Sequence, residues 1–327
     1  MPKVALFGNK NCSQTQRLRD ILQDEGAQPL VFDIELGAEP GPSVTIAPRW
    51  FKWGGVDFAD IAAVHIRCKS VNTPAFIPPL LDSASYLELR CRYLLEQQYQ
   101  SATNTFIDQL ARRGKLVINS FTSAYLDHDA KAQLYEKLRA QGFAVPRSLM
   151  TNDPDRALNF VTEVGQAIAK PTIGIGSTRR VTEADLGRLG ELRACPVLLQ
   201  EFVVGDTLRV HIVGDTVVLA LKVISDDPVD SRTAMKGVEY FQLPEGEEQL
   251  LVKANRALGL HYAAWDILAT PEGRYVYLDC NPGPHIMWLG EENVSIVFRE
   301  LARYMIAYAR TGSVSEAAQA VRPGRPS

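Results

Sequence analysis

The 327-residue chain is long enough for two or three domains and a substantial core. Its composition, 46% hydrophobic and 22% charged, is that of a globular protein, and a net charge of −3 excludes a global bias toward nucleic acid or anionic membranes. Five scattered cysteines without a C-x-x-C pair, no apolar run near the ~18 residues of a membrane span and no signal-peptide pattern predict a soluble, cytoplasmic protein without a disulfide framework.

The first 120 residues are predicted to form a β-α-β domain. The apolar run Val4–Phe7 predicts a strand, a helical pattern follows it, and PLVFDI predicts a second strand. The later elements of this domain are two strands and a long helix, expected at Ala63–Arg67, Lys115–Asn119 and Ser83–Arg113. Because β-α-β units place their strands in parallel, residues 1–120 predict a parallel sheet.

Two helices with clear boundaries are expected next. In HDAKAQLYEKLRAQG, apolar residues share one helical face, Asp127 or Asp129 is the expected N-cap, and Gly142 ends the helix. In TNDPDRALNFVTEVG, Asp153 is the expected N-cap and Gly165 the end. Both segments therefore carry a start and a stop signal.

From Val197 the sequence becomes rich in strand patterns, with a hairpin expected at Gly214–Asp215. A helix near Glu247–Leu258, a last hairpin and a helix over Val294–Ala309 follow. The residues after that helix have little to bury. The chain beyond the first domain is accordingly divided into two subdomains and a mobile tail: 121–197, 198–310 and 311–327.

The last hairpin ends in a group of oxygen ligands. AAWDILAT, a PEG turn and YVYLDCN place Asp266 opposite Leu278 or Asp279. Like charges at ~5 Å across a strand pair need a counter-charge, and a divalent cation such as Mg²⁺ suits two carboxylates and an amide oxygen. The alternative is that they are solvated turn residues. Strict alternation assigns two opposite faces, the second to the core: Tyr275, Tyr277, Asp279 and Asn281, against Val276, Leu278 and Cys280.

Basic residues elsewhere could hold a phosphate-bearing ligand. Lys170 ends an apolar strand before a loop with Gly174, Gly176 and Ser177, whose backbone N–H groups can approach phosphate oxygens closely. A flexible surface turn is the alternative for this loop. Lys131 lies beside the apolar stripe of its helix, where a surface lysine is the alternative.

A third basic signal lies in LLQEFVVGDTLRVHIV. Glu201 interrupts an apolar strand before a reversal at Gly205, and Arg209 faces the same side as His211. The planar guanidinium of arginine suits phosphate or carboxylate, although an ordinary surface arginine is the alternative.

Taken in order, these motifs resemble the ATP-grasp superfamily of carboxylate ligases over roughly Asn119 to Ala309. The stretches VPRSLMTNDPDRALNFV, VISDDPVDSR and GLHYAAWDILATPEGRYVYLDCNPGPHIMWL look most similar to the ribosomal-protein glutamate ligases and the graspetide maturases, which cross-link microviridin-type peptides. The resemblance implies an α/β (α+β) protein with the ATP-grasp fold and an N-terminal Rossmann-like pre-ATP-grasp domain.

The resemblance also implies roles for single residues. Arg209 would steady the transferred phosphoryl group, Arg232 would lie near the reacting carboxylate, and Lys170 would serve both catalysis and ATP binding. One or two Mg²⁺ ions, or Mn²⁺, would be held by three ligands: Asp266, Asp279 and Asn281. The residues that would contact ATP are Lys131, Lys170, Gly174, Gly176, Ser177, Gln200, Glu201, Phe202, Val203 and Asp206.

The chain departs from the pattern of these families at three places. Asp279 stands where the superfamily usually has glutamate, so its carboxylate is one methylene closer to the backbone. The run NPGPHIMW replaces Asn-Pro-Asn-Gly-Gln-Trp, with His285 and Met287 in place of polar residues. Asp206 is one position from the expected ribose-binding acid, and Thr207 occupies that place.

The function implied is an ATP-dependent ligase for peptide modification or natural-product biosynthesis. It would activate a carboxylate as an acyl phosphate and join it to an amine or hydroxyl. The expected partners are ATP and a carboxylate substrate such as a ribosomal precursor peptide, with self-association and without nucleic acid or membrane. The alternatives are a ligase of small amino acids, a non-catalytic ATP-binding module, and an α/β protein whose charges are only structural.

Overall fold

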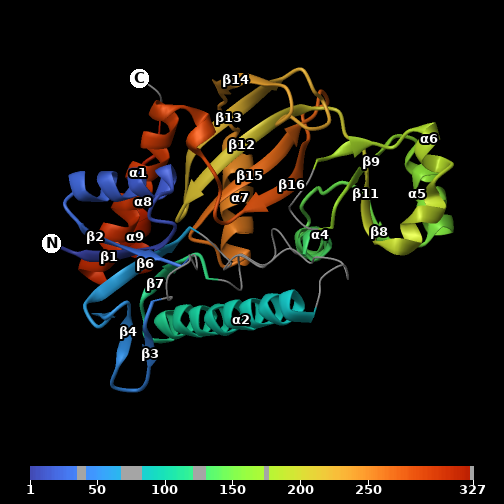
Figure 1. Ribbon diagram of the computed structural model, residues 1–327. Coiled ribbons are helices and arrows are strands. Elements are labelled where there is room, and N and C mark those ends of the chain that lie inside the picture. The colour runs from blue at the N-terminus through green and yellow to red at the C-terminus, as the bar shows by residue number, and fades with distance from the viewer. Residues whose placement is uncertain (35–41, 68–82, 121–129, 173–176, 325–327) are drawn as a thin grey trace. The chain divides into compact units, whose positions relative to one another are not determined.

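The computed structural model describes residues 1–34, 42–67, 83–120, 130–172 and 177–324. The chain divides into two compact units, Met1–Phe121 with His285–Arg322, and Thr122–Pro284 with Pro323–Ser327 (Figure 1). The long C-terminal helix therefore belongs with the N-terminal residues, and not with the segment 198–310 in which the sequence places it.

A parallel four-stranded sheet in the order β2-β1-β6-β7 forms the centre of the first unit. Helices α1, α2 and α8 pack against its strands, so that the predicted β-α-β start and parallel sheet are confirmed. These elements are β1 (Lys3–Gly8), α1 (Ser13–Asp24), β2 (Gln28–Asp33), β6 (Ile61–Ile66), α2 (Ser83–Arg112), β7 (Leu116–Ile118) and α8 (Glu291–Thr311).

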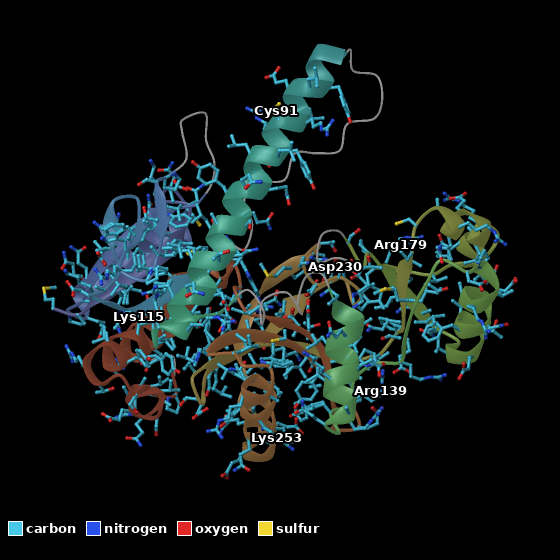
Figure 2. All side chains as sticks on the ribbon, turned by 90° about the horizontal axis from the view of Figure 1, so that it is seen from below. Cys91, Lys115, Arg139, Arg179, Asp230 and Lys253 are labelled. Carbon is cyan, nitrogen blue, oxygen red and sulfur yellow. The ribbon has the colours of Figure 1, made fainter. Side chains whose placement is uncertain are left out.

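Aromatic side chains fill the core of this unit. They come from the parallel sheet, from α2 and from a small antiparallel sheet of β3 (Val44–Ile46), β4 (Phe51–Trp53) and β5 (Val56–Asp57). The rings of Phe51 and Phe106 stack with centroids 4.1 Å apart. The N-terminal half of α2, which carries Cys91, extends away from the sheet of this unit (Figure 2).

The C-terminal residues bury more than the sequence indicates. A short 3₁₀ helix, η2 (Met287–Leu289), precedes α8, and α9 (Val314–Ala320) follows it. Ala317 and Val321 are buried, and α9 packs on α8. The expectation that residues 311–327 have little to bury is therefore wrong for this helix, because its small apolar face is covered by α8.

An antiparallel four-stranded sheet in the order β10-β9-β11-β8 forms one part of the second unit. Asp153 caps α5 by accepting hydrogen bonds from the backbone N–H groups of Asp155 and Arg156, and Gly165 ends it at φ 76°, as predicted. The elements of this part are β8 (Ser148–Thr151), α5 (Pro154–Val164), β9 (Ala167–Lys170), β10 (Arg179–Arg180), α6 (Glu183–Leu186), η1 (Leu189–Ala194) and β11 (Val197–Glu201).

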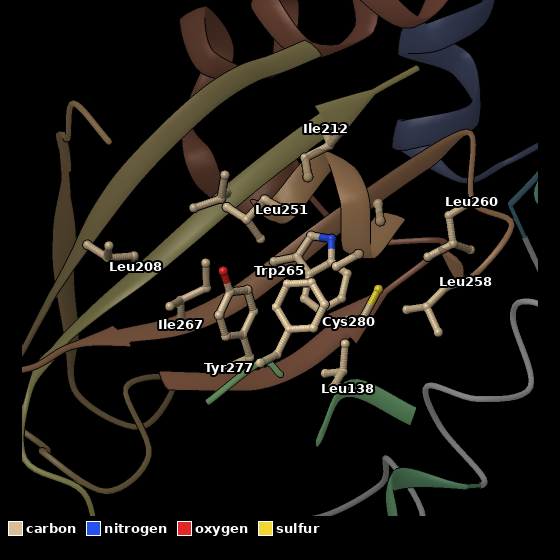
Figure 3. Close-up of a cluster of buried hydrophobic side chains, with 14 of the residues drawn as sticks. Leu138, Leu208, Ile212, Leu251, Leu258, Leu260, Trp265, Ile267, Tyr277 and Cys280 are labelled. Atoms are coloured by element: carbon tan, nitrogen blue, oxygen red, sulfur yellow. The ribbon is translucent and has the colours of Figure 1, made fainter. Parts of the chain in front are cut away.

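A five-stranded antiparallel sheet in the order β14-β13-β12-β15-β16 forms the other part. One face packs against α4 and α7, and its buried cluster includes Leu138, Leu251 and Trp265 (Figure 3). The N-cap of α4 is Ala130, whereas the two predicted N-cap residues, Asp127 and Asp129, lie outside the described residues. The elements are α4 (Lys131–Ala140), β12 (Asp206–Val213), β13 (Thr216–Ser225), β14 (Met235–Tyr240), α7 (Glu245–Ala257), β15 (Tyr262–Ala269) and β16 (Tyr275–Asn281).

A β-bulge at Leu278 changes the alternation of β16. Ile267 pairs with Tyr277 but Asp266 pairs with Asp279, so Leu278 is an extra residue in the ladder. Tyr277 consequently packs in the same buried cluster as Cys280 (Figure 3), and the predicted sharing of one face by Tyr277 and Asp279 is wrong. Asp279 and Asn281 still share a face because the bulge precedes both.

Among the cysteines in the described part of the chain, Cys12, Cys91 and Cys195 are free. Among the helices of those residues, none combines the length and the apolar character that crossing a membrane requires.

Gly205, in the connection from β11 to β12, lies close to the backbone of β15. A Cβ atom there would lie 2.7 Å from the carbonyl oxygen of Ala269. We expect Gly205→Ala to lower the free energy of unfolding by about 2 kcal/mol, because rigid backbone would have to move. The control is Gly246→Ala, where a Cβ atom meets nothing within 4 Å. Urea denaturation measures both, and an equal effect of the two substitutions would contradict this close approach.

Candidate active site

Asp266 and Asp279 face each other across the β15–β16 hairpin, which is one of the two registers that the sequence predicts. Asn281 lies on the same face, and its Nδ2 donates to Asp266 Oδ2 at 3.3 Å. One Asp279 oxygen, Oδ1, also accepts the backbone N–H of Cys280 at 3.0 Å. Two carboxylates and an amide therefore meet at the end of one hairpin.

Two basic side chains supply the predicted counter-charge. Arg209 Nη1 lies 2.7 Å from Asp266 Oδ1, because β12 and β15 are paired with Arg209 opposite Asp266. Lys131 Nζ lies 2.5 Å from Asp279 Oδ2. The side chains of both basic residues are only 9% exposed, so that the surface alternative for each is wrong. The first residue of α4 and the middle of β12 are thus tied to the hairpin.

Lys170 adds a third positive group. It ends β9, and burial, the largest effect, lowers its pKa to about 8. The positive charges of Lys131 and Arg232 lower this pKa further, while Asp279 and Asp266 raise it. Lys170 therefore shares one electrostatic environment with the two ion pairs.

Arg232 is fixed by Asp230 in the loop between β13 and β14. Its Nε donates to Asp230 Oδ1 at 2.7 Å and its Nη2 to Asp230 Oδ2 at 2.6 Å, which is a bidentate pair. Asp266 and Asp279 contribute to a raised pKa of Arg232, after the larger effect of Asp230. The hairpin acids and Arg232 therefore act on each other electrostatically, while the place of Arg232 near the reacting carboxylate stays a prediction.

Polar side chains at the end of β11 and the start of β12 bind neighbouring residues of the protein. Glu201 Oε1 accepts the backbone N–H of Arg147 at 2.9 Å, and Gln200 Nε2 donates to Ser148 Oγ at 3.0 Å. Asp206 Oδ2 pairs with Lys222 Nζ at 2.7 Å. These side chains lie at the end of β11 and the start of β12, and their contact with a nucleotide stays a prediction.

The first residue after β11, Phe202, is held both by the residue before β9 and by a side chain of β10. Phe202 N donates to Gln166 O at 2.8 Å, and the guanidinium of Arg180 lies over the Phe202 ring at 3.9 Å. Val203 follows and is half-buried. Gly174 and Gly176 lie outside the described residues, whereas Ser177 is exposed.

The donor set at the hairpin fits Mg²⁺. Over the described ranges, no group of three or more His, Cys, Asp or Glu side chains could hold a metal. The ligands that the sequence predicts are instead two carboxylates and one amide oxygen: Asp266, Asp279 and Asn281. Such a set matches Mg²⁺, which keeps few protein ligands and takes phosphate oxygens to complete its octahedron.

Two contributors to this site, Tyr135 and Asp230, are not apparent from the sequence alone, and His211 is more deeply buried than its place beside Arg209 indicates. Tyr135 donates its hydroxyl to the carbonyl oxygen of Leu278 at 2.7 Å and so supports the bulge. His211 is completely buried beside Arg209, and burial lowers its pKa well below the usual value. Asp230 is also buried, and its only sequence signal is the Asp-x-Arg spacing in VDSR.

The fold and the grouping of lysines, arginines and hairpin acids define a protein of the ATP-grasp class. The model of the RimK-like ATP-grasp domain matches residues 128–296, more than half of the chain, and the chain belongs to this family of ATP-dependent ligases. The ATP-grasp fold predicted from the sequence is thereby confirmed.

Named relatives agree with this family. A probable alpha-L-glutamate ligase of Pasteurella multocida (strain Pm70) is 27% identical over 237 residues, covering 63% of this chain and 74% of the relative. The ATP-grasp ligase PsnB, solved with a phosphomimetic variant of its minimal precursor, Mg and ADP, is 28% identical with a TM-score of 0.80, covering 94% and 98% of the two chains. The macrocyclase MdnC of Microcystis aeruginosa MRC, bound with precursor peptide MdnA, shares the fold at 19% identity and a TM-score of 0.74, over 91% and 98%.

The Arg209–Asp266 pair is expected to contribute to folding when no divalent cation is present. Asp266→Asn should lower the free energy of unfolding by roughly 3 kcal/mol, because it leaves the buried guanidinium without this carboxylate. The double variant Arg209→Leu with Asp266→Asn should lose less than the sum of the single losses. Urea denaturation in EDTA measures this cycle, and additive losses would contradict the pairing. Asp215→Asn, in an exposed pair with Arg256, is the control and should cost under about 1 kcal/mol.

Proposed function

We propose that this ligase activates a carboxylate of a peptide substrate as an acyl phosphate and joins it to an amine or hydroxyl. The observation that carries the proposal is the grouping of four basic residues around the hairpin acids: Lys131, Lys170, Arg209 and Arg232. Phosphoryl transfer needs little covalent help from a protein but needs positive charge at the transferring oxygens. This grouping provides that charge.

In the proposed reaction, an oxygen of the substrate carboxylate attacks the γ-phosphorus of ATP, the bond to the bridging oxygen breaks, and ADP leaves. Lys131 and Lys170 bind the phosphates, Arg209 stabilises the phosphoryl group in transfer, and Arg232 orients the acceptor carboxylate. One or two Mg²⁺ ions on Asp266, Asp279 and Asn281, or Mn²⁺ in their place, would supply further charge neutralisation. The nucleophile then attacks the acyl carbon, loses its proton and releases phosphate.

The nucleotide base is assigned to the strand end at β11. Glu201 and the backbone of Val203 would contact adenine, with Gln200 and Phe202 beside them and Asp206 toward the ribose. Ser177 and the glycine-rich segment with Gly174 and Gly176 would cover the phosphates and exclude water from the acyl phosphate. The support for this assignment is the resemblance of these positions to the ATP-grasp pattern.

An acidic side chain of a ribosomal precursor peptide is the favoured substrate. The support is the likeness to PsnB, solved with a phosphomimetic variant of its minimal precursor, Mg and ADP, at 28% identity over almost the whole of both chains. Self-association also stays part of the proposal. The second candidate is ligation of free glutamate, which is favoured by the relative named probable alpha-L-glutamate ligase. Turnover with free glutamate, without any peptide, would favour this second candidate.

Calorimetry with a non-hydrolysable ATP analogue tests the proposed nucleotide and metal site. We expect the wild type to bind the analogue tightly only with Mg²⁺. The double variant Asp266→Asn with Asp279→Asn should lose at least about 100-fold in Mg²⁺-dependent affinity, because two ligands of the ion are gone. Asp215→Asn, on the exposed β12–β13 turn, is the matched control and should bind as the wild type does.

Mg²⁺ dependence is the decisive reading of that experiment. Asp266 and Asp279 neutralise Arg209 and Lys131, so the double variant is more basic and could retain weak binding of metal-free nucleotide. Equal binding by the wild type and the double variant, with and without Mg²⁺, would overturn the metal site.

The fall of activity at alkaline pH should follow the deprotonation of Lys170. With its pKa near 8 this lysine is protonated below that pH and neutral above it, so kcat/KM for ATP should fall as pH rises through about 8. The neighbouring charges of Asp279, Asp266, Lys131 and Arg232 are already included in this value. Lys170→Arg keeps the charge at higher pH and should flatten this fall. An unchanged fall in this variant would assign the titration to another group.

A further inference from the structure

The irregular part of β16 is held by α4 and by the segment that follows α4. Strand β16 lies at the edge of its sheet. The backbone N–H of Tyr277 donates to the carbonyl oxygen of Ala144 at 2.9 Å. The hydroxyl of Tyr135 donates to the carbonyl oxygen of the next residue, Leu278, at 2.7 Å. The edge strand is therefore fastened at the bulge itself and at the residue before it.

The bulge decides which way the Asp279 carboxylate points. Leu278 is the extra residue of the ladder and directly precedes Asp279. Because of this residue, Tyr277 packs in the buried cluster (Figure 3) while Asp279 and Asn281 face the other side of the sheet. A regular strand would give Tyr277 and Asp279 the same face, so that one of them would lose its place. The direction of the carboxylate thus depends on the backbone at Leu278.

Two side chains of α4, one helical turn apart, act on this part of β16. Lys131 and Tyr135 lie four residues apart and so share a face of the helix. Lys131 Nζ holds the side chain of Asp279 at 2.5 Å from Oδ2, whereas Tyr135 holds the backbone one residue earlier. Lys131 would have to share the carboxylate oxygens with a bound divalent cation. The Tyr135 hydroxyl would not, because it binds a backbone carbonyl.

The burial of Tyr135 suits it to this task. The residue is 1% exposed, whereas the side chain of Asp279 is 23% exposed and remains within reach of solvent. A buried hydroxyl that donates to a backbone carbonyl satisfies both groups, and its removal costs the carbonyl oxygen this partner. A buried donor therefore fixes the backbone behind a partly exposed ligand.

We propose that Tyr135 is a positioning residue for Asp279, and that through the bulge it sets the direction in which this carboxylate meets a divalent cation. The inference rests on the proposed function and deepens it. Tyr135 touches no reacting atom in this role and acts only through the backbone of Leu278. Loss of its hydroxyl should therefore weaken the Mg²⁺ dependence of nucleotide binding and leave the binding of metal-free nucleotide unchanged.

The test titrates AMPPNP into Tyr135→Phe by calorimetry, over a series of Mg²⁺ concentrations and in EDTA. We expect the Mg²⁺ concentration for half-maximal binding to rise about tenfold, as for other partners that orient a metal ligand. Binding in EDTA should stay within about twofold of the wild type. Tyr308→Phe is the matched control, because the Tyr308 hydroxyl donates to the carbonyl oxygen of Gly114 at 2.8 Å within the first unit. It should behave as the wild type does in both conditions.

A second background shows whether Tyr135 acts through Asp279. In Asp279→Asn the hydroxyl has no carboxylate to orient, so adding Tyr135→Phe should change the Mg²⁺ dependence by less than about twofold. A tenfold further loss in that background would overturn the positioning role, as would wild-type Mg²⁺ dependence in Tyr135→Phe alone.

Hydrogen exchange in EDTA gives a reading that needs neither ion nor nucleotide. The Cys280 amide donates to Asp279 Oδ1 at 3.0 Å, and it should exchange about tenfold faster in Tyr135→Phe, because the backbone at the bulge is less restricted. Unchanged exchange there would contradict the tether. A Tyr135→Phe variant that does not fold, as its thermal unfolding would show, makes the hydroxyl a structural requirement and also overturns the inference. Wild-type protein whose AMPPNP binding is independent of Mg²⁺ overturns the proposed metal site, and this inference with it.

Discussion

The second unit is organised by the repulsion between two carboxylates that face each other on one hairpin. Asp266 and Asp279 are opposite in the ladder, where like charges are destabilising. The positive groups that offset this repulsion come from elements distant in sequence, Lys131 at the start of α4 and Arg209 in β12. The requirement for charge compensation thus brings a helix start and a central strand to the end of the hairpin, where the phosphate chemistry is proposed.

The apolar face of the same sheet fixes the position of these charges. Leu208 and Val210, the neighbours of Arg209 on β12, belong to the buried cluster against α4 and α7. Since strand residues alternate, this cluster forces Arg209 to the opposite face, the side of Asp266. A shift of the register by one residue would place the guanidinium in the apolar core. The geometry of the site therefore depends on ordinary core packing as much as on its ion pairs.

Local patterns in the sequence were sufficient for much of the fold. The capped helix α5 and the β12–β13 hairpin depend on neighbouring residues, and both are confirmed. The hairpin of Asp266 and Asp279 is confirmed in one of its two predicted registers. The failures are of two kinds. The bulge at Leu278 depends on packing of Tyr277 and Cys280, which strict alternation cannot express. The burial of Lys131 depends on a partner 148 residues away, so the local pattern suited a surface lysine equally well.

Asp230 shows a further limit of sequence reasoning. Arg232 was singled out by resemblance, but nothing in VDSR indicates that the carboxylate two residues before it would also accept a backbone N–H from beside the glycine-rich segment. The assignment of α8 to the first unit has the same origin, because it depends on contacts with α1 and β6 and not on position in the chain. Long-range partners decide both features.

The balance of charge explains how one site can serve both folding and nucleotide binding. Four basic side chains meet three carboxylates, those of Asp230, Asp266 and Asp279, which leaves a net charge of +1 when Lys170 is protonated. A single excess charge attracts an anionic nucleotide only weakly. A divalent cation on the two hairpin acids would compete with Lys131 and Arg209 for the same oxygens and make their charges available to phosphate oxygens. Asp230 faces no such competition, because its partners are Arg232 and a backbone amide. The arginine proposed to orient the acceptor carboxylate would therefore keep its position while the other two ion pairs exchange partners.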